Sequence, residues 1–215
     1  ALPALKKLLS EWPEPLGTRL DIGEDLKEEL FRLRGSVALA ISQIDPNDRI
    51  ALAVLLDHAD ADYACRRRLA EIGAGCRELV PQLSEQLAGS NGQPQTAKAE
   101  LLWHLDPQNP AIVPALTHAM GHTNGALRAY AAFCYWKVTG DADTTMKVLV
   151  AGLDEPPSQA SQMFPQWLGD MEAAARPAVP ALKKALWHHD LYARRNAEKA
   201  LMKIDPIALE FLNPP

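Results

Sequence analysis

Apolar residues recur along the chain at a constant interval, and this periodicity predicts repeated helical hairpins. One column, with steps of 33 positions after an opening step of 28, contains Ile44, Ile72, Leu105, Val138, Met171 and Ile204. A second column in the same register contains Leu55, Leu83, Leu116, Leu149 and Leu182. A third column reads Pro81, Pro114, Lys147 and Pro180. A fixed period in this range is typical of stacked helix pairs.

Within one repeat, the apolar positions follow helical spacing. Leu127, Ala131 and Val138 lie on one face of a first helix, and Leu182 and Leu186 lie on one face of a second helix. Prolines ahead of the second-helix leucines suit a first helical turn, where the missing N–H has no intrahelical partner. No run alternates between polar and apolar residues with a period of two, so we expect no strands.

The same pattern gives the bounds of the expected helices and the turns between them. We expect helices at 1–9, 25–43, 46–58, 63–72, 76–87, 95–105, 112–120, 125–138, 143–153, 158–171, 178–187, 192–204 and 206–212. Asp-Pro pairs at 45–46, 106–107 and 205–206 predict an aspartate cap followed by proline in the first turn. Pro165 lies inside an expected helix and should kink or shorten it.

Two phrases carry a resemblance to a known repeat family. AVPALKKAL at 178–186 and YARRNAEKALMKI at 192–204 resemble HEAT-like repeats of the short variety named after the phycobilin lyases. The resemblance implies an all-α fold, an α-α superhelix forming a right-handed solenoid, and a single domain at 1–215 of about six repeats. The implied segments are a half-repeat at 1–9, an acidic loop insertion at 10–23, and repeats at 24–60, 61–89, 94–122, 125–154, 158–189 and 191–212.

The N-terminal end of the repeat pattern leaves two points open. ALPALKKLL at 1–9 matches the second helix of a repeat without its first helix, so it is either a natural cap or the end of a longer array. The segment at 10–29 is rich in acidic residues and contains two prolines and two glycines in its first part. It is either an interaction segment or a tolerated insertion.

Composition narrows the functional classes. A net charge of −5 over 215 residues argues against a general nucleic-acid binder, which normally has a basic domain. No apolar run reaches the length of a membrane span, and no leader pattern opens the chain. Cys65, Cys76 and Cys134 do not form a disulfide framework and read as small buried hydrophobes in a reducing compartment, which favours a cytoplasmic location.

The resemblance also implies where a partner would bind, because second helices line the concave side of such superhelices. The exposed stripe expected on these helices includes Ile50, Val54, Asp57, Ala61, Glu78, Gln82, Glu85, Gly89, Ala111, Ala115, His118, His122, Thr144, Val148, Ala151, Glu155, Pro177, Ala181, Lys184 and His188. It is acidic towards the N-terminal half. We expect polar partner contacts at Asp57, Glu85, His118 and Lys184 and apolar contacts at Ala115, Val148 and Ala181. The alternative is an ordinary solvated face.

Chemical motifs are sparse. His118 and His122 are spaced for one helix face, and His188-His189-Asp190 occupies a similar turn, but no further ligands follow nearby, so we expect no metal. The phosphate loop, the dinucleotide-binding motif and the nucleophile elbow are missing from the sequence. The His-Glu pairs of HEAT-like hydroxylases are missing too, and the stripe lacks the basic character of HEAT-like DNA glycosylases.

Other residue groups permit both functional and structural interpretations. Trp103 and Trp136, 33 positions apart, form either a stacking ladder or packing between repeats. Two basic clusters, Arg66-Arg67-Arg68 and Arg194-Arg195, favour a structural interpretation, in which they form salt bridges between neighbouring repeats. Tyr130, Phe133 and Met163 form either an exposed apolar patch or part of the core.

The sequence therefore favours a non-catalytic scaffold that binds a protein or peptide on the concave face, without a cofactor. The alternative is an enzyme or chaperone of the bilin-lyase kind, which would hold a tetrapyrrole in the same groove. Only fold-level analogy supports that alternative. The oligomeric state has no signal in the sequence.

Overall fold

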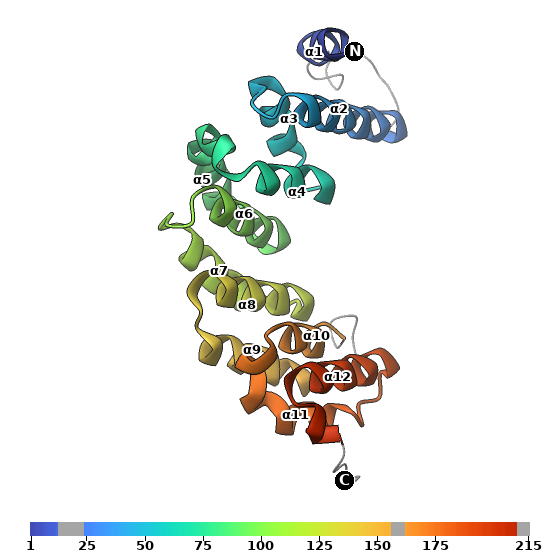
Figure 1. The fold of residues 1–215 in the computed structure, drawn as a ribbon, viewed down its shortest axis with the longest axis vertical. Coiled ribbons are helices and arrows are strands. Elements are labelled where there is room, and N and C mark those ends of the chain that lie inside the picture. Colours follow the sequence, from blue (N-terminus) through green and yellow to red (C-terminus); the bar gives the residue numbers. More distant parts are fainter. Residues whose placement is uncertain (13–23, 156–161, 210–215) are drawn as a thin grey trace. The chain divides into compact units, whose positions relative to one another are not determined.

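The computed structural model of the chain describes residues 1–12, 24–155 and 162–209 (Figure 1). The described residues form helices and turns and contain no strand, which confirms the all-α class. The α-helices are α1 (Leu2–Ser10), α2 (Glu24–Ile44), α3 (Arg49–His58), α4 (Tyr63–Ile72), α5 (Val80–Ala88), α6 (Gly92–Leu105), α7 (Ile112–Met120), α8 (Gly125–Thr139), α9 (Ala142–Leu153), α10 (Met163–Asp170), α11 (Val179–Ala185) and α12 (Leu191–Ile204). Short 3-10 helices are η1 (Gly73–Leu79), η2 (Glu172–Ala178) and η3 (Pro206–Leu209).

Helix α3 begins later than its Asp-Pro pair predicts. Its N-cap is Asp48, whose carboxylate accepts a hydrogen bond from the Ala51 N–H at 2.9 Å. The Asp45 carboxylate instead accepts from the N–H of Asn47 at 3.3 Å, so the chain makes a turn before the helix starts. The predicted helix start at Pro46 is therefore wrong. At the third pair, Pro206 does begin a helix, the 3-10 helix η3.

Pro165 lies where a proline is tolerated in a helix. Helix α10 begins at Met163, which places Pro165 in its first turn, where the missing N–H removes no intrahelical bond. The described part of the predicted helix at 158–171 is shortened as expected. Residues 158–161 of that prediction, most of the acidic loop insertion, and 210–212 lie outside the described residues.

The chain divides into two compact units. The first consists of residues 1–89 and 100–109, and the second of residues 90–99 and 110–215. In the first unit α1, α2, α3 and α4 pack in succession, and α1 also contacts α3 while α2 contacts α4 (Figure 1). In the second unit α7, α8, α9 and α10 pack in succession. There α8 also contacts α10, α9 contacts α11, and α10 contacts α12.

The leucine column identified in the sequence is buried throughout. Leu55 and Leu83 in the first unit are completely buried, as are Leu116, Leu149 and Leu182 in the second. The column that runs from Ile44 to Ile204 is less regular. Ile44 is 56% exposed at the end of α2, and of the later members only Leu105, Met171 and Ile204 are buried. The repeat pattern therefore marks core positions reliably on the second helices.

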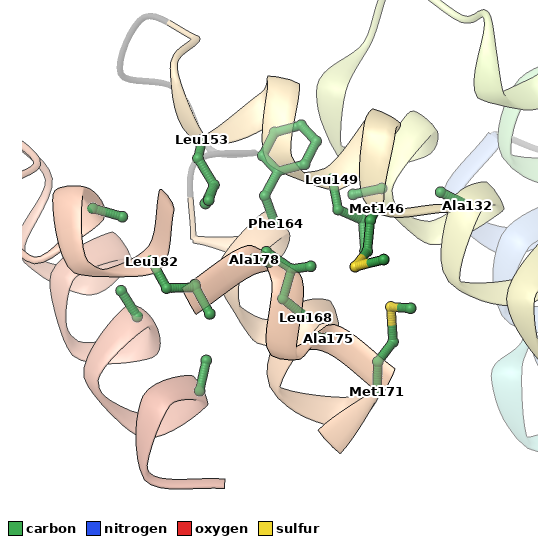
Figure 2. Close-up of a cluster of buried hydrophobic side chains, with 14 of the residues drawn as sticks. Ala132, Met146, Leu149, Leu153, Phe164, Leu168, Met171, Ala175, Ala178 and Leu182 are labelled. Atoms are coloured by element: carbon green, nitrogen blue, oxygen red, sulfur yellow. The ribbon is translucent and has the colours of Figure 1, made fainter. Parts of the chain in front are cut away.

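The core of the second unit draws buried residues from every helix between α7 and α12 and from the segments η2 and η3; Figure 2 shows a part of it. Helix α9 contributes Met146 and Leu149, and α10 contributes Phe164 and Leu168. Leu182 of α11 and alanines from η2 belong to the same cluster. Small residues on η2 allow this segment to lie close to its neighbours, which is why an irregular 3-10 turn is accommodated inside the packed unit.

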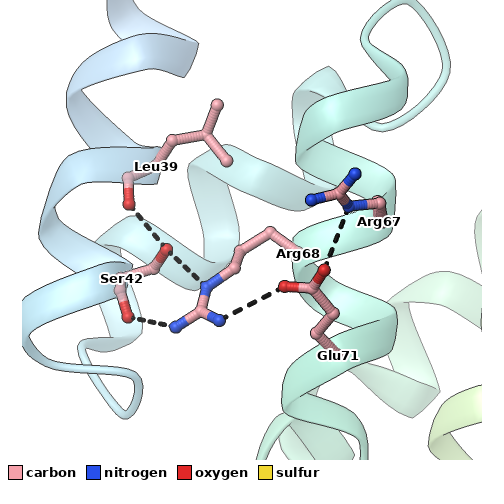
Figure 3. Close-up of polar contacts among 5 residues, drawn as sticks. All are labelled: Leu39, Ser42, Arg67, Arg68 and Glu71. Carbon is pink, nitrogen blue, oxygen red and sulfur yellow. Dashed lines mark hydrogen bonds and ion pairs between the residues drawn. The ribbon is translucent and has the colours of Figure 1, made fainter.

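The arginine cluster at 66–68 has a structural role in the first unit (Figure 3). The Arg68 guanidinium donates to the carbonyl oxygen of Ser42 at 2.7 Å and to its hydroxyl at 3.2 Å, which links α4 to α2, the first helix of the preceding pair. Arg67 and Arg68 both pair with Glu71 on their own helix. Arg68 thus joins two helix pairs through hydrogen bonds to Ser42, whereas its ion pair and that of Arg67 stay within α4, so the salt bridges predicted between repeats are not formed by these two arginines.

Candidate partner-binding surface

Two of the candidate polar residues lie on second helices of the first unit. Asp57 on α3 and Glu85 on α5 are both exposed. Beside them, Glu78 forms an ion pair with Arg49 at 3.1 Å. The sequence of this unit contains 11 basic and 17 acidic residues, a net charge of −6. The unit as a whole is therefore acidic, and the exposed charged residues on α3 and α5 themselves are Arg49, Asp57 and Glu85.

The other candidates lie in the second unit, on α7, α9 and α11. His118 is exposed, and its Nδ1 lies 3.0 Å from the side-chain oxygen of Gln95. Lys184 is exposed and pairs with Asp154 at 2.6 Å. Val148 and Ala181 are half-buried and pack at the edge of the apolar core. With 11 basic and 10 acidic residues, this unit has a net charge of +1.

The exposed stripe is wrong at two positions. Ala115 is only 8% exposed and Val54 only 2% exposed, so neither presents a surface to a partner. The physical reason is the width of the buried face: α7 buries Ala115 and Ala119 in addition to Leu116. A single column of leucines defines the centre of a buried stripe but not its edges.

A hollow lies between α9 and the η2–α11 segment. Its volume is about 340 Å³, and its walls are formed by Asp143, Met146, Lys147, Val150, Pro177 and Ala178. Pro177 belongs to the expected stripe, so the hollow borders the candidate surface within the second unit. The repeat analysis gave no direct signal for it, because it arises from side chains that depart from the repeat.

The histidines in the turns accept backbone hydrogen bonds. His122 Nδ1 accepts from the N–H of Asn124, and His188 Nδ1 accepts from the N–H of Asp190, both at 3.0 Å. Asn124 and Asp190 are in turn the N-caps of α8 and α12. The histidines thus help to start a helix. Within the described ranges, no group of three His, Cys, Asp or Glu side chains is placed to hold a metal ion.

The cysteines are placed for packing. Cys65, Cys76 and Cys134 are free and buried. Burial, with the nearby Asp62, raises the pKa of the Cys65 thiol to about 12. Burial also raises the pKa of Cys76 to about 11. Both are therefore protonated thiols near neutral pH, in agreement with the interpretation as small buried hydrophobes, and neither has the character of a nucleophile.

The apolar outer residues pack into the second unit. Phe133 stacks on Trp167 with ring centroids 4.4 Å apart, and Tyr130 lies 6.1 Å from the same indole ring. Trp136 lies 5.7 Å from the Phe133 ring. Met163 is half-buried against the core cluster. Of the two alternatives left by the sequence, the structure favours core packing over an exposed apolar patch.

A buried histidine that the sequence did not single out lies in the first unit. His58 is 1% exposed, with Nδ1 2.8 Å from the Val54 carbonyl oxygen and Nε2 2.9 Å from that of Phe31. The Nε2 contact joins α3 to Phe31 of α2, and the Nδ1 contact stays within α3. Because both partners are main-chain carbonyls, we assign His58 a structural role. No spacing in the sequence marks these two carbonyls as its partners.

Comparison of the chain with protein-family models, curated proteins and solved structures gave no match. Within the described residues, no helix combines the length and the apolar character needed to cross a bilayer.

Proposed function

We propose that the protein is a non-catalytic scaffold that binds a protein or peptide partner through its second helices. The observation that carries the proposal is the exposure of Asp57, Glu85, His118 and Lys184, which occupy one equivalent position of the second helices, a position that α9 fills with the exposed Ala151. A mostly polar, exposed position that recurs at the repeat interval of the sequence suits contacts with an extended partner.

The proposal includes the arrangement implied by the resemblance to HEAT-like repeats. In it, the helix pairs continue as a right-handed solenoid with the second helices on the concave side. Local packing supports this arrangement, because in each unit helices contact both the next helix and the next but one. This is the pattern expected when hairpins stack with first helices beside first helices.

The chemistry of the described residues supports binding over catalysis. Cys65 and Cys76 are buried, protonated thiols, Cys134 is buried, and His122 and His188 are engaged with helix caps. The tetrapyrrole alternative gains no support from the hollow beside α9, whose walls contain neither Trp nor His. We therefore retain the scaffold as the function that the side chains support best.

A charge-reversal pull-down tests the proposal. The Asp57→Lys/Glu85→Lys variant should lose partners that the native protein captures from a lysate of its source cells, because two exposed carboxylates of the candidate surface become cations. The matched control is Asp25→Lys/Glu29→Lys, which makes the same charge change on the exposed side of the first helix α2. An unchanged partner set in the first variant would count against the second-helix surface. Loss in the control alone would assign binding to the acidic segment instead.

A further inference from the structure

The hollow between α9 and the η2–α11 segment exists because its walls depart from the repeat. Ala178 occupies the position that Leu79, Ile112 and Thr145 hold in the three preceding hairpins, where all three larger side chains are buried; the first hairpin also has an alanine there, Ala51. The truncation leaves space beside α9 that the equivalent hairpins fill. A cavity that is open to solvent and lined by apolar atoms costs free energy in a scaffold that does not use it.

The facing wall on α9 departs from the repeat in the opposite direction. Val150 stands where Ser84, Thr117 and Lys183 occur, so this wall is more apolar than in those three hairpins; the first hairpin has the buried Leu56 at this position. Next to it, Met146 reaches the hollow from the apolar core. The small side chain of Ala178 on one wall and the apolar side chain of Val150 on the other together form a binding site for an apolar side chain. At about 340 Å³ the hollow is at the lower end of ligand pockets, which span roughly 300–1,000 Å³.

The charges at the hollow favour an anionic neighbour for that side chain. Lys147 replaces the proline of the equivalent second helices, and it is exposed. Unlike Lys184, it makes no hydrogen bond or ion pair with any residue that the structure describes. Asp143 also lines the hollow, but it lies in the first turn of α9, where a carboxylate stabilises the helix dipole. The pKa of Asp141, the N-cap of α9, is lowered by hydrogen bonds from Thr144 and also by the charge of Lys147, so this ammonium has an electrostatic neighbour on its own helix. Because Lys147 is exposed, it remains available to a partner's carboxylate.

We propose that this hollow is the anchor site for a partner peptide. It binds one Leu-sized apolar side chain, and Lys147 pairs with a carboxylate next to that side chain. The inference rests on the proposed scaffold function and specifies the chemistry of its partner. A buried apolar anchor beside an exposed charge pair is the common composition of an interface hot spot and its rim.

Methionine-methyl NMR tests this site directly. The chain contains five methionines, and the Met146 signal is assigned by its loss in Met146→Leu. The probe is a blocked Gly/Ser peptide with one Leu between two Asp residues. The comparison peptides replace both Asp residues with Lys, or the Leu with Gly. We expect the first peptide to shift the Met146 signal, and both replacements to weaken binding at least about tenfold, a difference of about 1.4 kcal/mol.

Variants separate the two contacts. Lys147→Glu should weaken binding of the Asp-Leu-Asp peptide about tenfold, and Val150→Glu should abolish the Met146 shift. Thr117→Glu, at the position of α7 equivalent to Val150, is the matched control and should leave binding unchanged. Unperturbed signals from the other methionines establish that each variant is folded. The proposal is overturned if the Met146 signal does not move at millimolar Asp-Leu-Asp peptide, or if the Lys-Leu-Lys peptide binds equally well.

The two proposals fail in different ways. If Asp57→Lys/Glu85→Lys loses its captured partner while Lys147→Glu and Val150→Glu keep it and no peptide binds, the scaffold function stands and the anchor site is wrong. If the peptide binds at Met146 while Asp57→Lys/Glu85→Lys keeps every captured partner, the hollow binds peptides but the second-helix column is not the partner surface.

Discussion

The ring of Phe164 occupies the space that any side chain at Gly152 would need. A Cβ atom on Gly152 would lie 2.2 Å from Cε1 of Phe164, far inside van der Waals contact. Gly152 is buried near the end of α9, and Phe164 is completely buried on α10 (Figure 2). The close approach of these two helices therefore depends on a glycine at this position.

Gly152→Ala should destabilise the protein by about 1–3 kcal/mol, because the added methyl group displaces a ring that has no free space around it. The helix propensity of alanine would act in the opposite direction, by roughly 1 kcal/mol or less. Urea unfolding measures the difference. Gly89→Ala is the control, since its Cβ would meet the nearest atom at 3.9 Å, an ordinary contact. A Gly152→Ala variant as stable as the native protein would contradict the packing.

The stack between His58 and Phe31 gives a second stability prediction. The two rings lie 3.8 Å apart at 13°, and the His58 ring nitrogens also reach the carbonyls of Val54 and Phe31. His58→Phe preserves an aromatic ring for the stack and removes both polar contacts. We expect a loss of about 1–3 kcal/mol in urea unfolding, since buried carbonyls lose partners. His58→Ala should lose more. Equal stability of His58→Phe and the native protein would show that the polar contacts contribute nothing.

A substitution at Glu172 is predicted to stabilise the protein, whereas the substitutions at Gly152 and His58 destabilise it. Its φ of 50° lies in the left-handed region, and Gly73 holds the equivalent position in an earlier hairpin with a φ of 56°. Glu172→Gly should stabilise the protein by about 0.5–1 kcal/mol, because glycine adopts this backbone without steric cost. Glu172→Ala retains the Cβ and should give no gain. Thermal unfolding of the three proteins distinguishes the outcomes, and a lower melting temperature for Glu172→Gly would contradict the interpretation.

The contact of Lys6 with Asp45 and Asp48 should make the docking of α1 depend on pH. Lys6 Nζ lies 2.8 Å from Asp45 and 2.7 Å from Asp48. The hydrogen bond to Lys6 lowers the pKa of Asp45 below its ordinary value of 3.8. For Asp48, burial acts to raise the pKa, but the bonds from Lys6 and the Ala51 N–H outweigh it. The hydrogen bonds that the Lys6 ammonium donates to the two carboxylates raise the pKa of Lys6 above 10.5.

The sign follows from linkage. A lowered carboxylate pKa contributes stability that is present above the unfolded value and lost as pH falls through the folded one. A lysine whose pKa is raised on folding contributes stability that is fully present below its unfolded pKa and is lost as pH rises through its folded pKa. Lys6→Met should therefore be less stable than the native protein at pH 7, and the difference should disappear as pH falls below 3.8. Lys7→Met is the control, because Lys7 is 72% exposed. A difference that persists at pH 2 would contradict the ion-pair origin.

Much of the fold could be predicted from apolar spacing alone. The predicted ranges of α4 and α7 coincide with the observed helices, and the leucine column is buried in both units. The 3-10 segments η1 and η2 could not be predicted in this way, because tight turns depend on local backbone conformation. Gly73 and Glu172 both lie in the left-handed region at these turns, and no apolar period encodes that conformation.

The candidate surface could be predicted in outline but not in its edges. The exposure of Asp57, Glu85 and Lys184 follows from the helical period, because each lies two positions after a buried leucine of the column and therefore on another face of its helix. The prediction that Ala115 is exposed is wrong, because neighbouring helices decide whether an alanine at the edge of a stripe is covered. The hollow beside α9 could not be predicted from the sequence, because it depends on which side chains face each other across two segments of the chain.

Site-specific photocrosslinking tests the central claim most directly. Benzoylphenylalanine is placed one position at a time at Asp57, Glu85 and Lys184 on second helices, and at Glu71 and Glu198 on first helices, all of them exposed. Irradiation in a lysate of the source cells, followed by mass spectrometry, identifies the crosslinked proteins. We expect one protein to be captured from all three second-helix positions and from neither first-helix position. Capture from the first helices alone, or of unrelated proteins at each second-helix position, would contradict a shared partner surface on the second helices.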